Sequence, residues 1–249
     1  LKTKKFIPDL ICTPECSNII TNDKSYLLKN TTYEFDCPII KMAKLYAIEN
    51  CVSINIGSLL LKEKNKKKLV NRSFFISSKG KIIKRYDKIH MFDVDLGNGI
   101  SYTESATYAP GEKAIVTPLP WGNLGLSICY DIRFAYLYRA LAQAGANILC
   151  APAAFTKITG QAHWHVLQRA RAIETGCFMI SPGLCGDHGH GKESFGHSVI
   201  IDPWGEILAD GGTDIGIITA KIDMTIVTEA RQRVPAISHD KTFNVTGVN

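Results

Sequence analysis

The sequence predicts an α/β protein in which helices cover the outside of a mixed β-sheet. Strand-like and helical patterns alternate in the middle of the chain, between residues 124 and 181. Elsewhere, strand-like segments follow one another through short turns such as Lys79-Gly80, which is typical of hairpins. The 249 residues suffice to bury a large core and contain no internal repeat. We therefore expect one domain spanning residues 1–249.

The first half of the chain is expected to be rich in strands. Apolar residues at helical spacing predict a helix over 37–50. Strands are expected at 7–13, 51–61, 69–78 and 81–86, and residues 18–36 are polar and irregular. The glycine-containing segment 93–111 has no periodicity, so we expect a long loop of the kind that often covers a site.

The second half combines helices with short strands. Helices are expected at 134–145, where Gly145 provides the stop, at 161–175, and at 223–233, where Asp223 suits the N-cap. Strands are expected at 113–117, 124–128, 147–151, 178–181, 198–202, 206–209 and 216–222.

Cysteine usage predicts a reduced, cytoplasmic protein. Eight cysteines are spread over a long chain, and several lie in apolar runs such as 148–151. No Cys-x-x-Cys pair occurs, so we expect neither a disulfide framework nor a structural metal.

Charge and hydropathy exclude two classes of partner. Much of the net charge of +6 comes from the run Lys62–Lys68, which we interpret as a solvated hairpin loop because no aromatic residues interleave it. The longest apolar stretches are too short and too polar to span a bilayer. We expect a protein that binds neither nucleic acid nor membrane.

Three chemically reactive side chains follow predicted strands. Glu15 follows the first strand, Lys88 the strand that ends at Tyr86, and Cys129 the strand over 124–128. A thiol needs a base to accept its proton or a cation to stabilise its charge before it acts as a nucleophile. The three residues could therefore form a nucleophilic site. Equally, Glu15 could cap a turn, Lys88 could form a surface ion pair and Cys129 could fill the core.

Other polar residues have both structural and functional interpretations. We interpret the histidines as polar surface rather than a metal cluster. The Arg171 region is expected to form an ion pair that fixes a helix. Asp131 and Arg133 are expected to brace the nucleophile turn. The histidines are His163, His165, His188, His190 and His197, and the ion-pair candidates are Arg169, Arg171 and Glu174.

Five motifs carry a family resemblance. They are TPE at 13–15, RYDKIHMFD at 85–93, YTESATYAPG at 102–111, GLSICYDIRF at 125–134 and ARAIE at 170–174. In this order they resemble the nitrilase superfamily of carbon–nitrogen hydrolases. The resemblance implies that Glu15 is the general base, Lys88 the cationic stabiliser and Cys129 the nucleophile, while Glu104 positions substrate and water. It implies no cofactor and no metal.

The resemblance also implies a mechanism and a substrate class. Cys129 would attack an amide carbonyl, the backbone N–H of Tyr130 would help to stabilise the oxyanion, and a thioester would follow after ammonia leaves. Segments 154–175 and 185–208 look most like the amidases that include deaminated glutathione amidase and the ω-amidases. The expected substrate is therefore a small carboxylate-bearing amide of the α-keto-acid type. Candidate substrate-binding residues are Tyr130, Phe155 and Trp164, of which the last two could instead fill the core.

Two alternatives remain: hydrolysis of N-carbamoyl amino acids, and a non-catalytic scaffold or redox sensor in which Cys129 is a regulatory thiol. Three positions depart from the family pattern. Ala135-Tyr136 stands where Pro-Glu is usual, Leu184 replaces a frequent Gln, and Thr175 replaces a frequent Asn.

The implied architecture is a four-layer αββα sandwich, with two mixed sheets face to face and helices outside. Members of this superfamily assemble through the helix after the nucleophile, so we expect a homodimer or a larger even-numbered oligomer. They usually begin with a strand and helix before the position of Glu15, and we expect that this chain lacks both.

Overall fold

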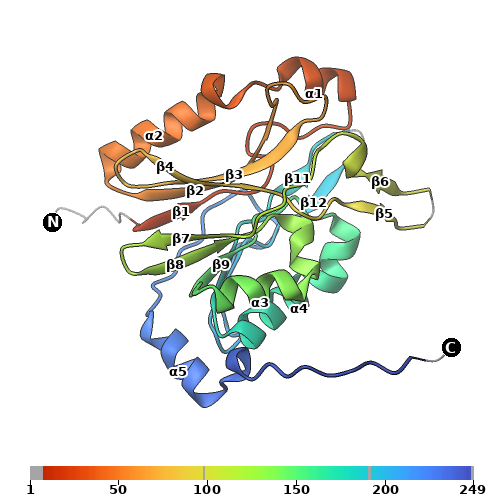
Figure 1. The fold of residues 1–249 in the computed structure, drawn as a ribbon. Coiled ribbons are helices and arrows are strands. Elements are labelled where there is room, and N and C mark those ends of the chain that lie inside the picture. Colours follow the sequence, from red (N-terminus) through yellow and green to blue (C-terminus); the bar gives the residue numbers. More distant parts are fainter. Residues whose placement is uncertain (1–7, 98, 190–191, 248–249) are drawn as a thin grey trace.

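Two β-sheets pack face to face, and helices cover the outer face of each sheet (Figure 1). The computed structural model describes residues 8–97, 99–189 and 192–247. The expected four-layer αββα architecture is confirmed.

The first sheet has the strand order β1-β2-β3-β4. Its strands are β1 (Leu10–Cys12), β2 (Ser53–Leu61), β3 (Val70–Ile76) and β4 (Ile82–Asp87). Strand β1 is parallel to β2, whereas β3 is antiparallel to both β2 and β4. Strands β1, β2 and β4 therefore run in the same direction, and the residues that follow β1 and β4 emerge at the same end of the sheet.

The second sheet has the order β14-β13-β10-β9-β8-β7. Its strands are β7 (Ile115–Leu119), β8 (Gly122–Leu126), β9 (Ile148–Cys150), β10 (Phe178–Ser181), β13 (Val199–Ile201) and β14 (Ile207–Asp210). Strands β8, β9 and β10 are parallel to one another, and the flanking strands are antiparallel to their neighbours. The sheet is mixed, as expected.

Side chains alternate between the layers. In β3, Phe74 and Ile76 pack against helix α2 (Pro38–Asn50), while Phe75 faces the second sheet. In β9, Ile148 lies between the sheets, while Leu149 packs with residues of α3 (Ala135–Gln143) and α4 (Lys157–Thr175). Successive residues of a strand point to opposite faces, so strands that are buried on both sides form three apolar layers.

The structure contains one helix and two hairpins that were not expected. Helix α1 (Lys24–Asn30) lies within the segment expected to be irregular, and the Asp23 carboxylate caps it by accepting from the Tyr26 N–H at 2.9 Å. Two hairpins were not expected, one of them within the predicted loop 93–111: β5 (Asp93–Asp95) with β6 (Ser101–Thr103), and β11 (Cys185–Asp187) with β12 (Glu193–Phe195).

The strand expected at 216–222 is wrong. These residues form no strand, and the isoleucines at 215 and 217 are 96% and 93% exposed. The apolar residues of this segment are spaced as in a strand, but no strand in the described part of the chain pairs with the segment. The last helix, α5 (Thr225–Arg233), is confirmed with a start two residues later than expected.

No helix in the described part of the chain is both long enough and apolar enough to cross a membrane.

Gly57 in β2 allows the segment after β1 to approach the second sheet. A Cβ at this position would lie 1.9 Å from the Thr13 carbonyl oxygen and 2.6 Å from Pro152 Cβ. Gly57→Ala must therefore displace backbone, and we expect it to lower the free energy of unfolding by at least about 1–3 kcal/mol. Thermal unfolding followed by circular dichroism measures this. Gly216→Ala, where a Cβ meets nothing within 4 Å, is the matched control, and equal melting temperatures for the two variants would contradict the packing argument.

Candidate active site

Glu15, Lys88, Glu104 and Cys129 converge at the end of the sandwich where β1, β4 and β8 terminate. The Lys88 Nζ lies 3.1 Å from Glu15 Oε1 and 2.9 Å from Glu104 Oε2. The Lys88 and Glu15 side chains are only 3% and 4% exposed, and that of Glu104 is 13% exposed. One ammonium group is therefore enclosed between two carboxylates beside a thiol.

Hydrogen bonds fix both carboxylates. Glu15 Oε1 accepts from Asn71 Nδ2 at 2.9 Å, and Glu15 Oε2 accepts from the Ala154 N–H at 2.8 Å. Glu104 Oε2 accepts from the Phe92 N–H at 2.6 Å. Donors to both oxygens of Glu15 restrict the orientation of its carboxylate, which also hydrogen-bonds Lys88 and Cys129.

Asn71 is a site residue that the sequence analysis missed. It is buried in β3, contacts Glu15 and lines the cavity. Its Oδ1 is buried without a hydrogen-bond partner among the described residues. The available signal was an amide side chain inside a segment predicted to be a strand, residues 69–78, because a buried polar group normally requires a partner.

The charges shift the pKa of each central group. Burial raises the pKa of Glu15, but the Lys88 charge and the hydrogen bonds to Glu15 outweigh it, so the net pKa lies below its ordinary value. Burial lowers the pKa of Lys88, but Glu104 and Glu15 raise it well above the ordinary value. Burial and the Glu15 charge raise the pKa of the Cys129 thiol well above normal, although Lys88 opposes this.

The resting site therefore holds an ionised Glu15, a protonated Lys88 and a neutral Cys129 thiol. A neutral thiol is a weak nucleophile, so it must lose its proton as it attacks. Glu15 is the adjacent ionised acceptor.

The nucleophile turn is braced by Asp131, as the sequence predicted. Cys129 begins a 3-10 turn (Cys129–Arg133) with φ +48°, a left-handed conformation that is strained for any residue except glycine. The fully buried Asp131 carboxylate accepts from the Ile128 N–H at 2.8 Å and from the Tyr86 hydroxyl at 2.6 Å, and His90 Nδ1 lies 2.7 Å from it. These contacts hold the turn in its strained form.

The first two amides of this turn have different partners. The Cys129 N–H donates to the Pro152 carbonyl at 2.9 Å, which ties the turn to the segment after β9. The Tyr130 N–H is at the start of a helical turn, where amides have no partner within the helix. It is thus a candidate donor to an oxyanion on a substrate that bonds to Cys129.

A cavity of about 370 Å³ opens onto Cys129. Its lining includes Tyr130 and Phe155, whose contact with substrate stays a prediction, together with Asn71 and two lysines from distant segments, Lys24 and Lys192. Tyr102 and Glu104 come from the predicted covering loop 93–111, which does contribute a wall of the cavity. Lys24 in α1 and Lys192 before β12 were not predicted, because only the fold brings them near Cys129.

Trp164 does not line the cavity, so the expectation of substrate contact is not met. The side chain is 1% exposed, its ring centroid lies 5.1 Å from that of Phe155, and its Nε1 donates to the His197 carbonyl at 2.8 Å. A tryptophan on the inner face of α4 packs in the core, and Phe155 separates it from the cavity.

Arg133 packs on Tyr130 within the nucleophile turn, and its role as a brace stays a prediction. Its guanidinium lies over the rings of Tyr130 and Phe155, with its carbon 5.9 Å and 5.4 Å from the ring centroids. The predicted ion pair in α4 is confirmed: Arg171 Nη1 lies 2.8 Å from Glu174 Oε1.

Three of the residues that depart from the family pattern each make a hydrogen bond. The Tyr136 hydroxyl hydrogen-bonds the Nε2 of His90, whose other ring nitrogen contacts Asp131. Thr175 is buried, and its hydroxyl donates to the Arg171 carbonyl at 2.6 Å. The Leu184 N–H donates to the Ala153 carbonyl at 2.8 Å, next to the residue that holds Glu15.

Comparison with known proteins shows the family of this chain. A family model described as carbon-nitrogen hydrolase matches residues 4–232. Deaminated glutathione amidase of Yersinia enterocolitica is 37% identical over 234 residues, which cover 93% of this chain and 82% of that protein. Deaminated glutathione amidase of Homo sapiens is 42% identical over 175 residues, which cover 69% of this chain and 53% of the human protein.

Solved structures with the same fold include the C. elegans NitFhit protein, with a TM-score of 0.88 and 32% identity, over 94% of this chain and 57% of that one. Saccharomyces cerevisiae Nit3, described as a member of branch 10 of the nitrilase superfamily, has a TM-score of 0.82 and 27% identity, over 93% of this chain and 82% of that one.

The strain at Cys129 gives a stability test. Cys129→Gly and Cys129→Ala both remove the thiol, but only glycine adopts φ +48° without strain. We expect the glycine variant to be more stable than the alanine variant by about 1 kcal/mol. Chemical denaturation of the two variants measures the difference. A less stable glycine variant would show that the turn is not strained.

Proposed function

The chain belongs to the carbon–nitrogen hydrolase family, and on this premise we propose that it is a Cys-dependent amidase. The proposed reaction converts a small carboxylate-bearing amide of the α-keto-acid type, such as deaminated glutathione, to the free acid and ammonia. The observation that carries the proposal is the enclosed Lys88 ammonium between Glu15 and Glu104, next to a neutral thiol that opens onto the cavity.

The first step is acylation. Glu15 accepts the thiol proton while the Cys129 sulfur bonds to the amide carbon, and the carbonyl π electrons move onto oxygen. The Lys88 ammonium and the Tyr130 N–H stabilise the resulting oxyanion. When the tetrahedral intermediate collapses, the proton held by Glu15 passes to the leaving nitrogen, ammonia departs, and a thioester remains on Cys129.

The second step is hydrolysis of the thioester. Glu15, ionised again, accepts a proton from a water molecule as its oxygen attacks the thioester carbon. Glu104, fixed by Lys88 and by the Phe92 N–H, is suited to hold that water or the substrate. The carbon–sulfur bond then breaks, the proton returns to the sulfur, and the acid leaves.

Cationic groups around the cavity support a substrate that carries a carboxylate. Lys24 and Lys192 belong to its lining, and the Arg133 guanidinium lies over the two aromatic rings of its wall. Lys88 is already paired with two carboxylates. Lys24, Lys192 and Arg133 lie outside that cluster, so they could attract a distant carboxylate on the substrate.

The comparisons do not favour the two alternatives. The Yersinia enterocolitica and Dictyostelium discoideum relatives are named deaminated glutathione amidase, not carbamoyl hydrolase. Lys88 contacts Glu15 and Glu104, and Glu15 hydrogen-bonds Cys129, which does not support a purely scaffolding role.

Assembly and compartment are part of the proposal. Eight unpaired cysteines support a reducing compartment such as the cytoplasm. We propose a homodimer, or a larger even-numbered oligomer, that forms through α3, the helix after the nucleophile. The exposed Tyr136 ring at its start supports that surface.

A substrate screen tests the proposed activity. Ammonia release is measured with deaminated glutathione, α-ketoglutaramate, α-ketosuccinamate and N-carbamoyl amino acids. We expect turnover of a keto-acid amide, and a loss of roughly 10⁴-fold or more in Cys129→Ala, because an alanine cannot form the thioester. Carbon dioxide released together with ammonia would instead indicate the carbamoyl reaction. Full turnover by Cys129→Ala would overturn the mechanism.

The shifted pKa values predict a broad pH profile. Glu15 must be ionised and Lys88 protonated; the first has a pKa below its ordinary 4.5 and the second well above its ordinary 10.5. At low substrate concentration the midpoint of the acid limb should therefore lie below pH 4.5, and the rate should not fall near pH 6–7 as it does in an enzyme with a histidine base. Circular dichroism at each pH checks that the protein stays folded.

Asn71→Leu provides the matched variant for this profile. It removes one hydrogen bond to Glu15 at similar side-chain volume, so the pKa of Glu15 should rise and the acid limb should move to higher pH. An unchanged limb in this variant would contradict the assignment of Glu15 as the base.

A further inference from the structure

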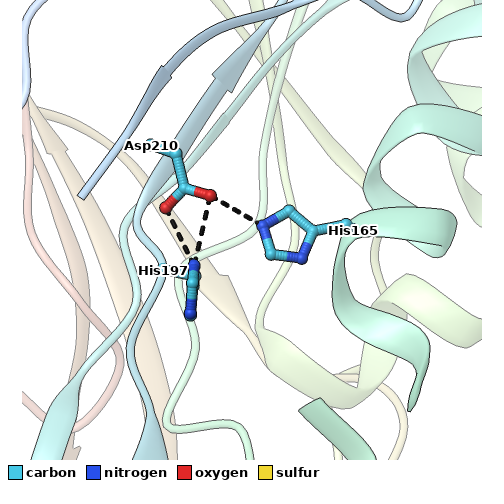
Figure 2. Close-up of side chains that lie close together, drawn as sticks. All are labelled: His165, His197 and Asp210. Atoms are coloured by element: carbon cyan, nitrogen blue, oxygen red, sulfur yellow. Dashed lines mark hydrogen bonds and ion pairs between the residues drawn. The ribbon is translucent and has the colours of Figure 1, made fainter. Parts of the chain in front are cut away.

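Two of the histidines interpreted as polar surface meet at one carboxylate. His165 projects from α4 and His197 from the segment before β13, and both rings approach Asp210, the last residue of β14 (Figure 2). His165 Nε2 lies 2.8 Å from Asp210 Oδ2, and His197 Nδ1 lies 3.0 Å from Oδ1. Three residues that are distant in sequence are thus brought together by the fold.

The remaining histidines of this region have other environments. His163 Nδ1 lies 3.3 Å from Arg133 Nη2, and His188 Nε2 lies 2.8 Å from the Ser194 hydroxyl. His190 lies outside the described residues.

The three side chains have the geometry of a small metal site. One ligand atom from each lies within 4.8 Å of the others. Ligand atoms around a tetrahedral zinc ion, at about 2.0–2.2 Å from it, are roughly 3.3 Å apart. The ligands could therefore surround an ion after small rotations of the two rings. Two imidazoles and a carboxylate form a donor set typical of zinc and related divalent metals.

Backbone contacts fix this geometry in advance. His197 has φ +51°, its N–H donates to the Gly212 carbonyl, and its own carbonyl accepts from Trp164 Nε1 at 2.8 Å. Its ring stacks on Phe195 with centroids 4.4 Å apart. The Gly212 N–H donates to Asp210 Oδ1 at 2.8 Å. A non-glycine residue held in the left-handed region often marks a site with a function.

The charges also suit a cation. In the described part of the chain, the ion pairs of Asp210 are made with the two imidazoles, and no lysine or arginine lies within 4.0 Å of it. A metal ion binds imidazole in its neutral form, so the Asp210 carboxylate would supply the negative charge of the site. The side chains are 24–30% exposed, so an ion can reach them from solvent.

We propose that His165, His197 and Asp210 bind a divalent transition-metal ion of the zinc class, which joins α4 to the β13–β14 hairpin. None of the three residues lines the cavity at Cys129, so the ion acts as a structural clamp rather than in catalysis. The proposal is independent of the amidase reaction.

Metal binding is tested on the full chain carrying Cys129→Ala, because the thiol and carboxylates of the active site could themselves bind metal. After treatment with a chelator, Zn²⁺ is titrated by calorimetry, with Mg²⁺ as the hard-cation control. We expect one equivalent of Zn²⁺ to bind and to raise the melting temperature of the protein. We expect no saturable binding of Mg²⁺. Co²⁺ should give a visible spectrum without a thiolate charge-transfer band.

Three variants identify the ligands. His197→Asn removes the ring but tolerates the left-handed backbone, Asp210→Asn keeps the bond from Gly212, and His165→Gln removes the third ligand. Each should weaken Zn²⁺ binding at least 10-fold, since even outer-shell changes can cost that much. His188→Gln is the matched histidine control and should bind as the parent does. Absence of saturable Zn²⁺ binding, or equal affinity in parent and all three variants, would overturn the proposal, and circular dichroism verifies that each variant is folded.

Discussion

The Lys88 ammonium, enclosed between Glu15 and Glu104, is the interaction on which the site depends. Removing an ion from water costs several kcal/mol even in a real protein interior, and here three ions are largely buried together. Each is tolerated because the others and the surrounding amides replace its hydration. Loss of one partner would leave an uncompensated charge. The surrounding fold must therefore hold each carboxylate about 3 Å from the ammonium, which explains the number of fixed donors around Glu15.

The two sheets satisfy this constraint by ending at the same place. Strands β1 and β4 deliver Glu15 and Lys88 from the first sheet, whereas Cys129 and Ala154 follow β8 and β9 of the second. The site thus lies where the sheets meet. Asn55 Nδ2, 3.3 Å from Cys150 Sγ, joins the two sheets near it, and Gly57 leaves the room that close approach needs. The packing of the two sheets against each other therefore sets the position of the nucleophile relative to Glu15 and Lys88.

The charge distribution keeps the thiol neutral until a substrate arrives. With two carboxylates and one ammonium, the surroundings of Cys129 are net negative, which disfavours a thiolate. A neutral, enclosed thiol is also less prone to oxidation than an exposed thiolate. The strained turn and its brace, Asp131, hold this thiol toward the cavity, and the Tyr136 hydroxyl extends the brace through His90. The departure from the family pattern at Ala135-Tyr136 is therefore connected to the nucleophile turn.

The sequence by itself determined the alternation of strands and helices, the positions of Glu15, Lys88 and Cys129 after strands, and, through the resemblance, the family. These are local features: apolar periodicity, turn residues and short motifs carry them. Only the tertiary structure decided that Asn71 holds Glu15, that Trp164 fills the core, that Lys24 and Lys192 face the cavity, and that His165 and His197 share Asp210. Each of these contacts joins residues far apart in the chain, or depends on which side of a helix faces inward. Neither property can be read from spacing along the sequence. The same limit explains the false strand at 216–222, because its apolar pattern was present but a partner strand was not.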